Sequence, residues 1–461
     1  MISKAKLNKL LNLCIKKGCD FAEFFLEDTK SNNYEFICGE VENIVTSYVY
    51  GVGIRVIKGE SEYYGYTNDI SYNNLVNLIE KITTSLEKKE NIEKVKLVLE
   101  KNENIHKTIM FPDKIDISKK ISYMQQTHDA CKNYSEEISK VSIKLFDKVQ
   151  GVTIANTNGK YIKDERVLAR IFCTAIASNE ETMQIAGDSI AGACGYEIFK
   201  NEDLEALGRK VAESVITILH ADEIKGGVMD VVIHNAFGGV LLHEACVHSL
   251  EAELVSKNAS VFSNMIGEKI ASDIVTAVDD GTIVNQWGSN NIDDEGAKAK
   301  RTVLIENGIL KSYLVDYKNS AKMNHQITGS GRRASYKYLP TARMTNTFFM
   351  PGKNTFEEII SKTKNGFFAK TMGGGSVDPS TGEFNFSVSE GYIIENGKIT
   401  KPVRGATLVG SGKSVLLNID MIADNLEFGY GICGASSGNI PVCVGQPTIR
   451  VRDMTVGGRG S

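Results

Sequence analysis

The spacing of apolar and polar positions predicts an N-terminal region that mixes helices with an antiparallel sheet. Near the start, apolar residues recur at the interval of one helix face, which predicts an amphipathic surface helix carrying Leu7, Leu10, Leu11, Cys14 and Ile15. Short β-branched or aromatic runs separated by glycine follow, and we interpret them as antiparallel strands at 21–27, 33–38, 40–48, 51–57 and 62–66. A helix is expected at about 71–86.

The middle of the chain repeats this mixture. A helix is expected near 115–135, and the strand-like runs after it lie at 139–149, 151–157 and 161–177. Asn158-Gly159 separates the last two of these runs and is a strong hairpin signal. Another helix is expected at about 203–220.

From Lys225 onward the pattern changes to glycine-rich β structure, in which the similar segments 303–310 and 392–399 are interpreted as hairpins. The predicted fold is therefore α+β: an N-terminal α+β region with an antiparallel sheet and flanking helices precedes a large, mostly antiparallel-β C-terminal domain that carries a metal-binding helix. The expected segments are an N-terminal α+β segment at 1–90, a charged linker at 91–112, a central α+β segment at 113–222 and the C-terminal domain at 223–461.

Composition and charge narrow the functional classes. The chain has 461 residues, enough for two or three domains, and a net charge of -4 that offers no basic surface for nucleic acid or anionic lipid. Lysines interrupt the apolar positions of 2–17, so no export signal is expected, and charged or imidazole side chains interrupt the apolar stretch 228–247, so no membrane span is expected. Nine scattered cysteines without a C-x-x-C pair are interpreted as reduced thiols. We expect a soluble, cytoplasmic protein.

A cluster of two histidines and a glutamate is the most informative feature of the sequence. Two of the seven histidines, His243 and His248, lie within six positions, and Glu244 follows the first. We interpret 228–234 as a strand and 235–255 as a helix entered through an asparagine cap and a Gly-Gly turn. Two imidazoles can hold a divalent metal that activates water, and an adjacent carboxylate can take the proton from that water.

The spacing of the two histidines predicts a distorted helix. Residues four apart on a regular helix lie about 40° apart around the axis, whereas residues five apart lie about 140° apart. His243 and His248 could therefore share one metal only if a π-bulge or a break lies between Glu244 and His248. Without shared ligation, both histidines would be ordinary capping or core residues.

A catalytic metal usually has three protein ligands, and the residues alone leave the third one open. Cys246 lies three positions after His243, and Cys433 lies in a glycine-rich turn, but either could equally be a buried structural thiol. Oxygen ligands are also conceivable in two acidic pairs that we interpret first as turns, Asp279-Asp280 and Asp293-Asp294. Arg332 and Arg333 could bind a peptide carboxylate, although a structural or solvated role is the simpler interpretation.

The C-terminal half resembles the metal-bearing TldD branch of the TldD/PmbA peptidase family. The matching segments run in the family's order across 225–460, and they include Val240-Leu-Leu-His-Glu-Ala, Val278-Asp-Asp-Gly-Thr, Ile292-Asp-Asp-Glu-Gly, Gly329-Ser-Gly-Arg-Arg, Arg343-Met-Thr-Asn-Thr and Lys401-Pro-Val-Arg-Gly-Ala-Thr-Leu. The N-terminal half matches more loosely through Asp20-Phe-Ala-Glu and Gly51-Val-Gly-Ile-Arg. Cys246-Val247 and Ser249 depart from the smaller residues expected around the second histidine.

The resemblance implies a complete site and a function. The metal ligands would be His243, His248 and Cys433, with Glu244 as the general base and a divalent metal, zinc by the family pattern, although the ligand set would also accept iron. It implies a metallopeptidase that hydrolyses unfolded or small, sometimes modified, peptides. It also implies a dimer, either with a PmbA-like (TldE-like) paralogue or with itself. The alternatives are a non-catalytic binding subunit of such a complex and a redox or metal-storage protein built on Cys433.

Overall fold

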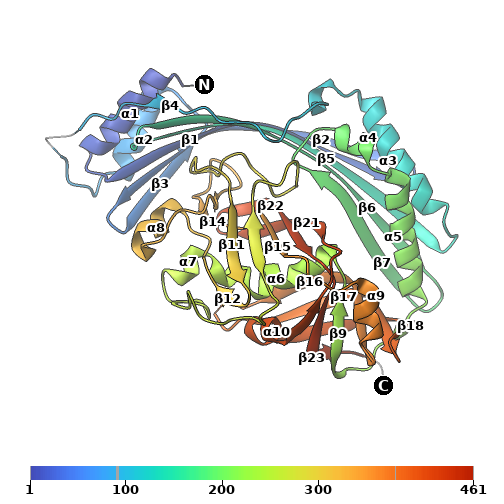
Figure 1. Ribbon diagram of the computed structural model, residues 1–461. Helices are drawn as coiled ribbons and strands as arrows, with labels where there is room; N and C mark the ends of the chain where they lie inside the picture. The colour runs from blue at the N-terminus through green and yellow to red at the C-terminus, as the bar shows by residue number, and fades with distance from the viewer. Residues whose placement is uncertain (1, 90–92, 379, 460–461) are drawn as a thin grey trace.

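The computed structural model describes residues 2–89, 93–378 and 380–459. A seven-stranded sheet forms the N-terminal layer, in the order β3-β2-β1-β5-β6-β4 with β7 also paired to β6. Its strands are β1 (Phe21–Ile37), β2 (Glu40–Lys58), β3 (Ser61–Thr67), β4 (Val98–Leu99), β5 (Ile138–Asn156), β6 (Lys160–Ser178) and β7 (Met183–Gly192). β1 pairs with β5, so the segments 1–90 and 113–222 contribute to one sheet. Figure 1 shows this sheet arching over the C-terminal domain.

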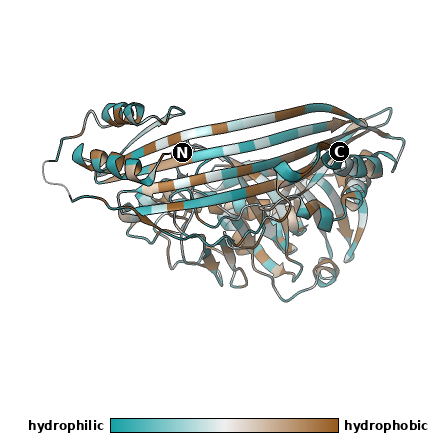
Figure 2. Cartoon of the chain, turned by 90° about the horizontal axis from the view of Figure 1, so that it is seen from above, coloured by the Kyte–Doolittle hydropathy of each residue, from teal (hydrophilic) through white to brown (hydrophobic). Residues whose placement is uncertain are grey.

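The strands of this sheet are much longer than the sequence pattern predicts. The runs 21–27 and 33–38 lie on one strand, β1, and 40–48 and 51–57 both lie on β2. The polar and glycine residues that seemed to separate these runs belong to the strands, and each of them has a partner on another strand. The amide of Asn32 donates to Asp147 on β5 at 2.6 Å, and a Cβ at Gly53 would meet the hydroxyl of Tyr64 at 2.0 Å. The prediction of short strands here was therefore wrong, and Figure 2 shows the long strands side by side with apolar and polar residues interspersed.

Helices cover the two ends of this sheet in two separate cores. α1 (Lys4–Lys16) and α2 (Tyr72–Ile82) pack on one end, and Leu7, Leu10, Leu11 and Cys14 are buried as their spacing predicts. α3 (Ile117–Lys132), α4 (Glu197–Asn201) and α5 (Leu204–Leu219) pack on the other end, with the 3₁₀ turn η1 (Pro112–Lys114) before them (Figure 1). The predicted hairpin at Asn158-Gly159 joins β5 to β6 and has Gly159 at φ +85°.

The C-terminal domain contains two larger sheets. One has eight strands: β8 (Asp222–Glu223), β9 (Gly227–Ile233), β16 (Asn365–Val377), β17 (Glu383–Glu395), β18 (Lys398–Arg404), β19 (Ala406–Ser411), β20 (Ile419–Ile422) and β23 (Ile449–Gly457). The other has six: β10 (Ala277–Asp280), β11 (Arg301–Glu306), β12 (Ile309–Leu310), β15 (Asn346–Phe349), β21 (Glu427–Ala435) and β22 (Gly438–Gln446). Most pairings are antiparallel, with parallel pairs at β9–β16, β15–β22 and β8–β18, so the α+β prediction is confirmed.

Short elements complete this domain. They are β13 (Gly331–Arg332), β14 (Thr341–Ala342), η2 (Ala236–Gly239), α6 (Val240–Ala245), η3 (Val247–Leu250), α7 (Ala252–Val255), α8 (Tyr317–Met323), α9 (Phe356–Ser361) and α10 (Gly412–Asn418). Both predicted hairpins are present, at β11–β12 and β17–β18, and their Asn-Gly turns have positive φ at Asn307 and Asn396. α6 lies between the two sheets in a large apolar core that includes Leu241 and Leu242.

The structure also bears on the expected reduced thiols and on the expected lack of a membrane span. Each of the nine cysteines is a free thiol, and all except Cys38 are buried. Among the described residues, no helix combines the length and the apolar character needed to cross a bilayer.

Candidate metal site

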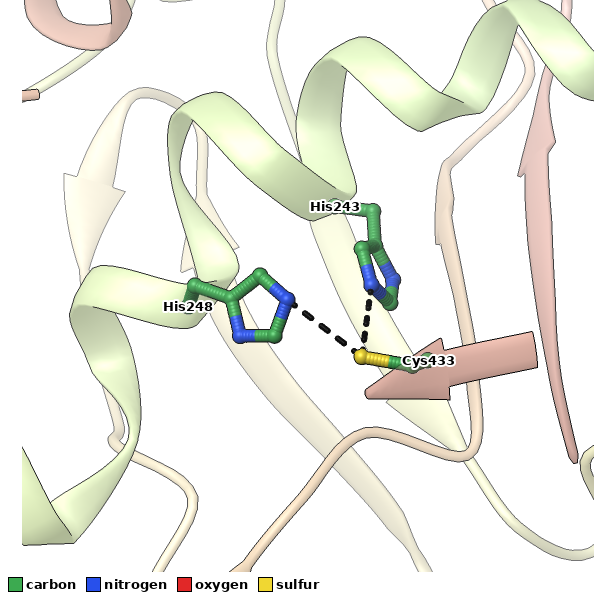
Figure 3. Close-up of side chains that lie close together, drawn as sticks. All are labelled: His243, His248 and Cys433. Atoms are coloured by element: carbon green, nitrogen blue, oxygen red, sulfur yellow. Dashed lines mark hydrogen bonds between the residues drawn. The ribbon is translucent and has the colours of Figure 1, made fainter. Parts of the chain in front are cut away.

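Three side chains from distant parts of the C-terminal domain converge on one point. His243 comes from α6, His248 from η3 and Cys433 from the edge strand β21 (Figure 3). The Sγ atom of Cys433 lies 3.3 Å from Nε2 of His243 and 3.4 Å from Nε2 of His248. All three potential ligand atoms lie within 4.8 Å of one another. The structure therefore brings together the three residues that the family resemblance selects.

A break in the helix makes this convergence possible. The single helix predicted over 235–255 is wrong, since this stretch forms the four short pieces η2, α6, η3 and α7. α6 ends at Ala245, and Cys246 has φ -128° and ψ -59°, outside the helical range. The distortion predicted between Glu244 and His248 is thus confirmed, as a break. It rotates His248 towards His243, so that both Nε2 atoms face the same thiol (Figure 3).

Close backbone contacts hold the broken segment in place. A Cβ at Gly412, the first residue of α10, would lie 1.8 Å from the carbonyl oxygen of Ala245, where α6 ends. A Cβ at Gly239 would lie 2.5 Å from the backbone nitrogen of Gly445 on β22. Only glycine permits such approaches, which bring α10 against the end of α6 and the start of α6 against β22, the strand that pairs with β21.

Two charged residues around the site orient its members, and sequence reasoning gave neither of them a role. The carboxylate of Glu251 lies 3.2 Å from Nδ1 of His248, which directs Nε2 towards Cys433. The Arg343 guanidinium donates to the carbonyl oxygen of Cys433 at 2.7 Å and to Oγ of Ser437 at 2.9 Å, and so fixes the β21–β22 turn. The i, i+3 spacing from His248 was an available signal for Glu251; Arg343 lies 90 positions from Cys433 and gave no local signal.

The two imidazoles have different electrostatic surroundings. Burial, with the nearby His248 and Arg343, holds the pKa of His243 well below its usual range. Burial also lowers the pKa of His248, but the Glu251 carboxylate and the Cys433 thiol outweigh it, and the pKa is raised well above its usual range. His243 is therefore a neutral ligand at once, whereas His248 must release a proton before its Nε2 can bind a cation.

Glu244 lies at the open side of the cluster. Its Oε2 is 3.7 Å from Nε2 of His248, and 26% of its side chain is exposed. Burial raises the pKa of this carboxyl, the neighbouring His248 lowers it and Glu251 raises it further, with a net upward shift. A carboxylate of raised pKa that still contacts solvent is suited to accept and return a proton.

The converging atoms fit a divalent metal. Bond lengths of about 2.1 Å to nitrogen and 2.3 Å to sulfur at a tetrahedral angle place two ligand atoms roughly 3.6 Å apart. The two sulfur–nitrogen separations of 3.3 and 3.4 Å are close to that value. Nδ1 of His243 is buried and has no hydrogen-bond partner among the described residues. No contact at Nδ1 therefore prevents Nε2, the other ring nitrogen, from binding a metal.

The other candidate ligands lie elsewhere. Cys246 is fully buried, and burial raises the pKa of its thiol to about 12. Asp279 accepts from the backbone and hydroxyl of Thr345. The remaining carboxylates bond to loop or strand groups: Asp280 to Thr282, Asp293 to Gly331, and Asp294 to Arg166. Within the described residues none of these joins the cluster.

Arg332 and Arg333 are buried and internally bonded. Arg332 donates to the backbone carbonyls of Met344 and Pro441, and Arg333 is paired with Glu23 on β1. Both arginines thus have partners within the protein, as the simpler of the two interpretations expects.

Three family models cover almost the whole chain. The PmbA/TldA metallopeptidase C-terminal domain matches residues 226–458, the central domain of that family matches 111–219, and its domain 1 matches 22–85. A "Metalloprotease TldD homolog" of Haemophilus influenzae is 33% identical over 99% of this chain and 97% of its own length. A "Zinc metalloprotease TldD homolog" of Saccharolobus solfataricus is 27% identical over 74% of this chain and 75% of its own.

A solved structure shares the fold. TldE from Thermococcus kodakarensis superimposes with a TM-score of 0.78 at 16% identity, over 98% of this chain and all of that one. At this identity the likeness concerns the fold alone.

Proposed function

We propose that this chain, which belongs to the PmbA/TldA metallopeptidase family, hydrolyses peptide bonds with a divalent metal held by His243, His248 and Cys433. The observation that carries the proposal is the convergence of these three side chains, with sulfur–nitrogen separations of 3.3 and 3.4 Å, beside a carboxylate that is still accessible. A buried structural thiol would need neither the two imidazoles nor the charged neighbours.

The residues of the site have separate tasks in this reaction. A divalent metal bound there would lower the pKa of a bound water and polarise the carbonyl of the scissile bond. Glu244 takes the proton from the attacking water and later gives it to the leaving amine. Glu251 holds the His248 ring through Nδ1, and Arg343 holds the backbone of Cys433, so both residues position ligands without touching the substrate.

Zinc is the metal we propose. Two imidazoles and a thiolate form a common zinc donor set that leaves a position open for water and substrate. One relative is named a zinc metalloprotease. The same donors would also accept iron, so metal analysis of the purified protein decides between them.

The proposed substrates are unfolded or small peptides, including modified ones. Cys433 lies on β21, which is the last strand of its six-stranded sheet, and its neighbour Ile432 is 53% exposed. An extended peptide could add to this strand edge by backbone hydrogen bonds and so pass beside the metal ligand. A folded protein could not offer such a segment.

We further propose that the protein acts in the cytoplasm as a dimer, with a PmbA-like (TldE-like) paralogue or with itself. The alternative function is a non-catalytic binding subunit of such a complex. The same variants that test catalysis also decide between these two functions, because a binding subunit has no need for Glu244.

Replacement of Glu244 by glutamine tests the proposal. We expect Glu244→Gln to retain its metal and to lose turnover of an unstructured peptide by about 10²-fold or more, because a positioned base is removed. Cys433→Ser should lose most of the metal, as measured by elemental analysis, and chelator should abolish cleavage by the unmodified protein. Glu253→Gln is the matched control, since Glu253 lies on α7 and is paired with Lys257.

The possible failures separate the roles. Unchanged turnover of Glu244→Gln would remove Glu244 from the mechanism. Metal content in Cys433→Ser equal to that of the unmodified protein would remove Cys433 from the ligand set. A protein that binds metal but cleaves no peptide under any condition would favour the binding subunit.

A further inference from the structure

A cavity of about 50 Å³ lies between the N-terminal sheet and the C-terminal domain. Its walls come from β5 and β6, from the charged linker, and from β13 and β22, and they include Lys148, Arg166 and His106. It shares no residue with the cluster of His243, His248 and Cys433. The volume suffices for a few atoms beyond a single water molecule, so a small ligand or a terminal group fits.

Hydrogen-bond donors without acceptors line this cavity. The backbone N–H of Asn285 donates to Nδ1 of His106, which fixes the tautomer with the proton on Nε2. That Nε2–H is buried and makes no hydrogen bond of normal geometry with the described residues, although the backbone of Asn290 lies near enough to the ring to raise its pKa against the effect of burial. Lys148 on β5 is half-buried, and its ammonium has no hydrogen bond or ion pair with the residues that the structure describes. Nε and Nη1 of Arg333, which also lines the cavity, are buried without a hydrogen-bond partner among the described residues. A buried donor without an acceptor is costly, so these nitrogens favour an occupant that accepts.

Charged side chains in the walls of the cavity also favour an occupant that accepts hydrogen bonds. Four basic side chains, Lys148, Arg166, Arg332 and Arg333, face the cavity against two carboxylates, Glu165 and Asp294. Asp294 is already bonded to the Arg166 guanidinium and to the backbone of Arg333, and Arg332 has only backbone carbonyls as hydrogen-bond partners. Burial lowers the pKa of Lys148 and, despite Asp294, that of Arg332 to about 10. Arg166 is paired with Asp164 and Arg333 with Glu23, and against the effect of burial these carboxylates raise the pKa of both guanidinium groups. Lys148 and Arg332 are therefore the wall cations that lack a carboxylate partner among the described residues.

We propose that this cavity is a binding site for a small oxyanion, held by Lys148, by the Nε2–H of His106 and by the surrounding arginines. A carboxylate or phosphate group would accept from the unpaired donors and place a negative charge beside Lys148 and Arg332. This site is separate from the proposed metal site and does not depend on peptidase activity. Its wall includes Pro441 on β22, which pairs with β21, so an anion bound there would also brace the hairpin that carries Cys433.

Two sources could supply this chemistry: free inorganic phosphate or the terminal carboxylate of a peptide. Thermal unfolding of the whole chain, at pH 7 and constant ionic strength, distinguishes them. The probes are sodium phosphate against sodium chloride, and acetyl-dialanine with a free carboxylate against its C-terminal amide. A ligand that binds only the folded protein raises Tm with a saturable dependence on its concentration.

The decisive variant is Lys148→Met, because Lys148 can lose its charge without leaving a carboxylate unpaired. Lys140→Met, at an exposed position of the same strand, is the matched control. We expect phosphate or the free-acid peptide to raise Tm in the unmodified protein and in Lys140→Met, and Lys148→Met to need at least about tenfold more of it, the effect of losing one charge-assisted hydrogen bond. If Lys148→Met does not fold, Lys148→Gln takes its place in the same measurement, because glutamine keeps a hydrogen-bond donor and removes the charge.

Each outcome is informative. A response to phosphate alone identifies a free inorganic anion, and a response to the free acid but not the amide identifies a peptide carboxylate. The proposal is overturned if neither probe stabilises the unmodified protein, which would leave a merely hydrated cavity. It is also overturned if the anion raises Tm of Lys148→Met and Lys148→Gln at the same concentrations as in the unmodified protein. The anion would then bind elsewhere, for example at the metal.

Discussion

At the scale of single residues, two charged side chains orient the members of the proposed metal site. The Glu251 carboxylate accepts from Nδ1 of His248 at 3.2 Å, and its other oxygen lies 3.9 Å from Nε of Arg343. Arg343 in turn bonds to the carbonyl oxygen of Cys433. One ligand ring and one ligand backbone are thus linked through a carboxylate and a guanidinium, which orient them before any metal binds.

We therefore expect Glu251→Gln to weaken metal binding by about tenfold, within the range found when a group behind a ligating histidine is changed. The glutamine amide can still accept a hydrogen bond from Nδ1 of His248. It has no negative charge, however, and so it no longer stabilises the positive charge that a bound metal induces on the His248 ring. Competition with a chelator measures the dissociation constant directly. Glu253→Gln should bind metal as the unmodified protein does. An unaltered constant in Glu251→Gln would show that His248 needs no such support.

At the scale of secondary structure, local patterns were predictable and contacts between distant elements were not. His243, Glu244 and His248 are neighbours in sequence, so their spacing alone predicted both a metal site and a break in the helix. Cys433 lies 190 positions from His243, and residue chemistry alone could not choose between it and Cys246. The long strands β1 and β2 were missed for the same reason, because the partners at their apparent interruptions come from other segments: Asn32 on β1 donates to Asp147, and Tyr64 fills the space beside Gly53 on β2.

His234 offers a test at this scale, since it follows strand β9 and lies between rings from α9 and β16. Its ring centroid is 5.2 Å from that of Phe356 and 5.3 Å from that of Phe368, and burial, with Lys370 and Lys210 nearby, lowers its pKa to about 4. The unfolded chain therefore binds a proton on this residue at a higher pH than the folded chain does. Its contribution to stability falls as the pH drops from about 6.5 to about 4, and the loss then levels off.

We expect acid to destabilise the unmodified protein more than His234→Gln over this interval, by on the order of 2 kcal/mol. Urea unfolding of both proteins at pH 7 and pH 4.5 gives the difference directly, and titration of the other groups cancels between them. His220→Gln is the control, because His220 is an exposed histidine that contacts Glu137. Equal acid sensitivity in His234→Gln and the unmodified protein would contradict the depressed pKa.

At the scale of the whole molecule, buried ion pairs join the N-terminal sheet to the C-terminal domain. Arg55 on β2 contacts Glu295, and Arg333, directly after β13, contacts Glu23 on β1. These partners are 240 and 310 positions apart, and a sequence gives no sign of which charges will meet. The proposed oxyanion cavity lies at this junction, with walls from both layers.

Arg55→Met tests how strongly this junction holds the fold together. Arg55 also bonds to Glu62 at 2.5 Å, so its loss leaves two carboxylates without this cation in a buried setting. We expect a loss of about 3–5 kcal/mol in the free energy of unfolding, measured with urea, because breaking a buried pair leaves the remaining charge uncompensated. Lys58 lies on β2, as Arg55 does, and forms an exposed pair with Asp20. Lys58→Met should therefore lower the free energy of unfolding by less than about 1 kcal/mol. The addition of Glu295→Gln should restore part of the loss in Arg55→Met, since it removes a stranded charge. If the double variant is no more stable than the single one, packing of the arginine stem and not its charge joins the two layers.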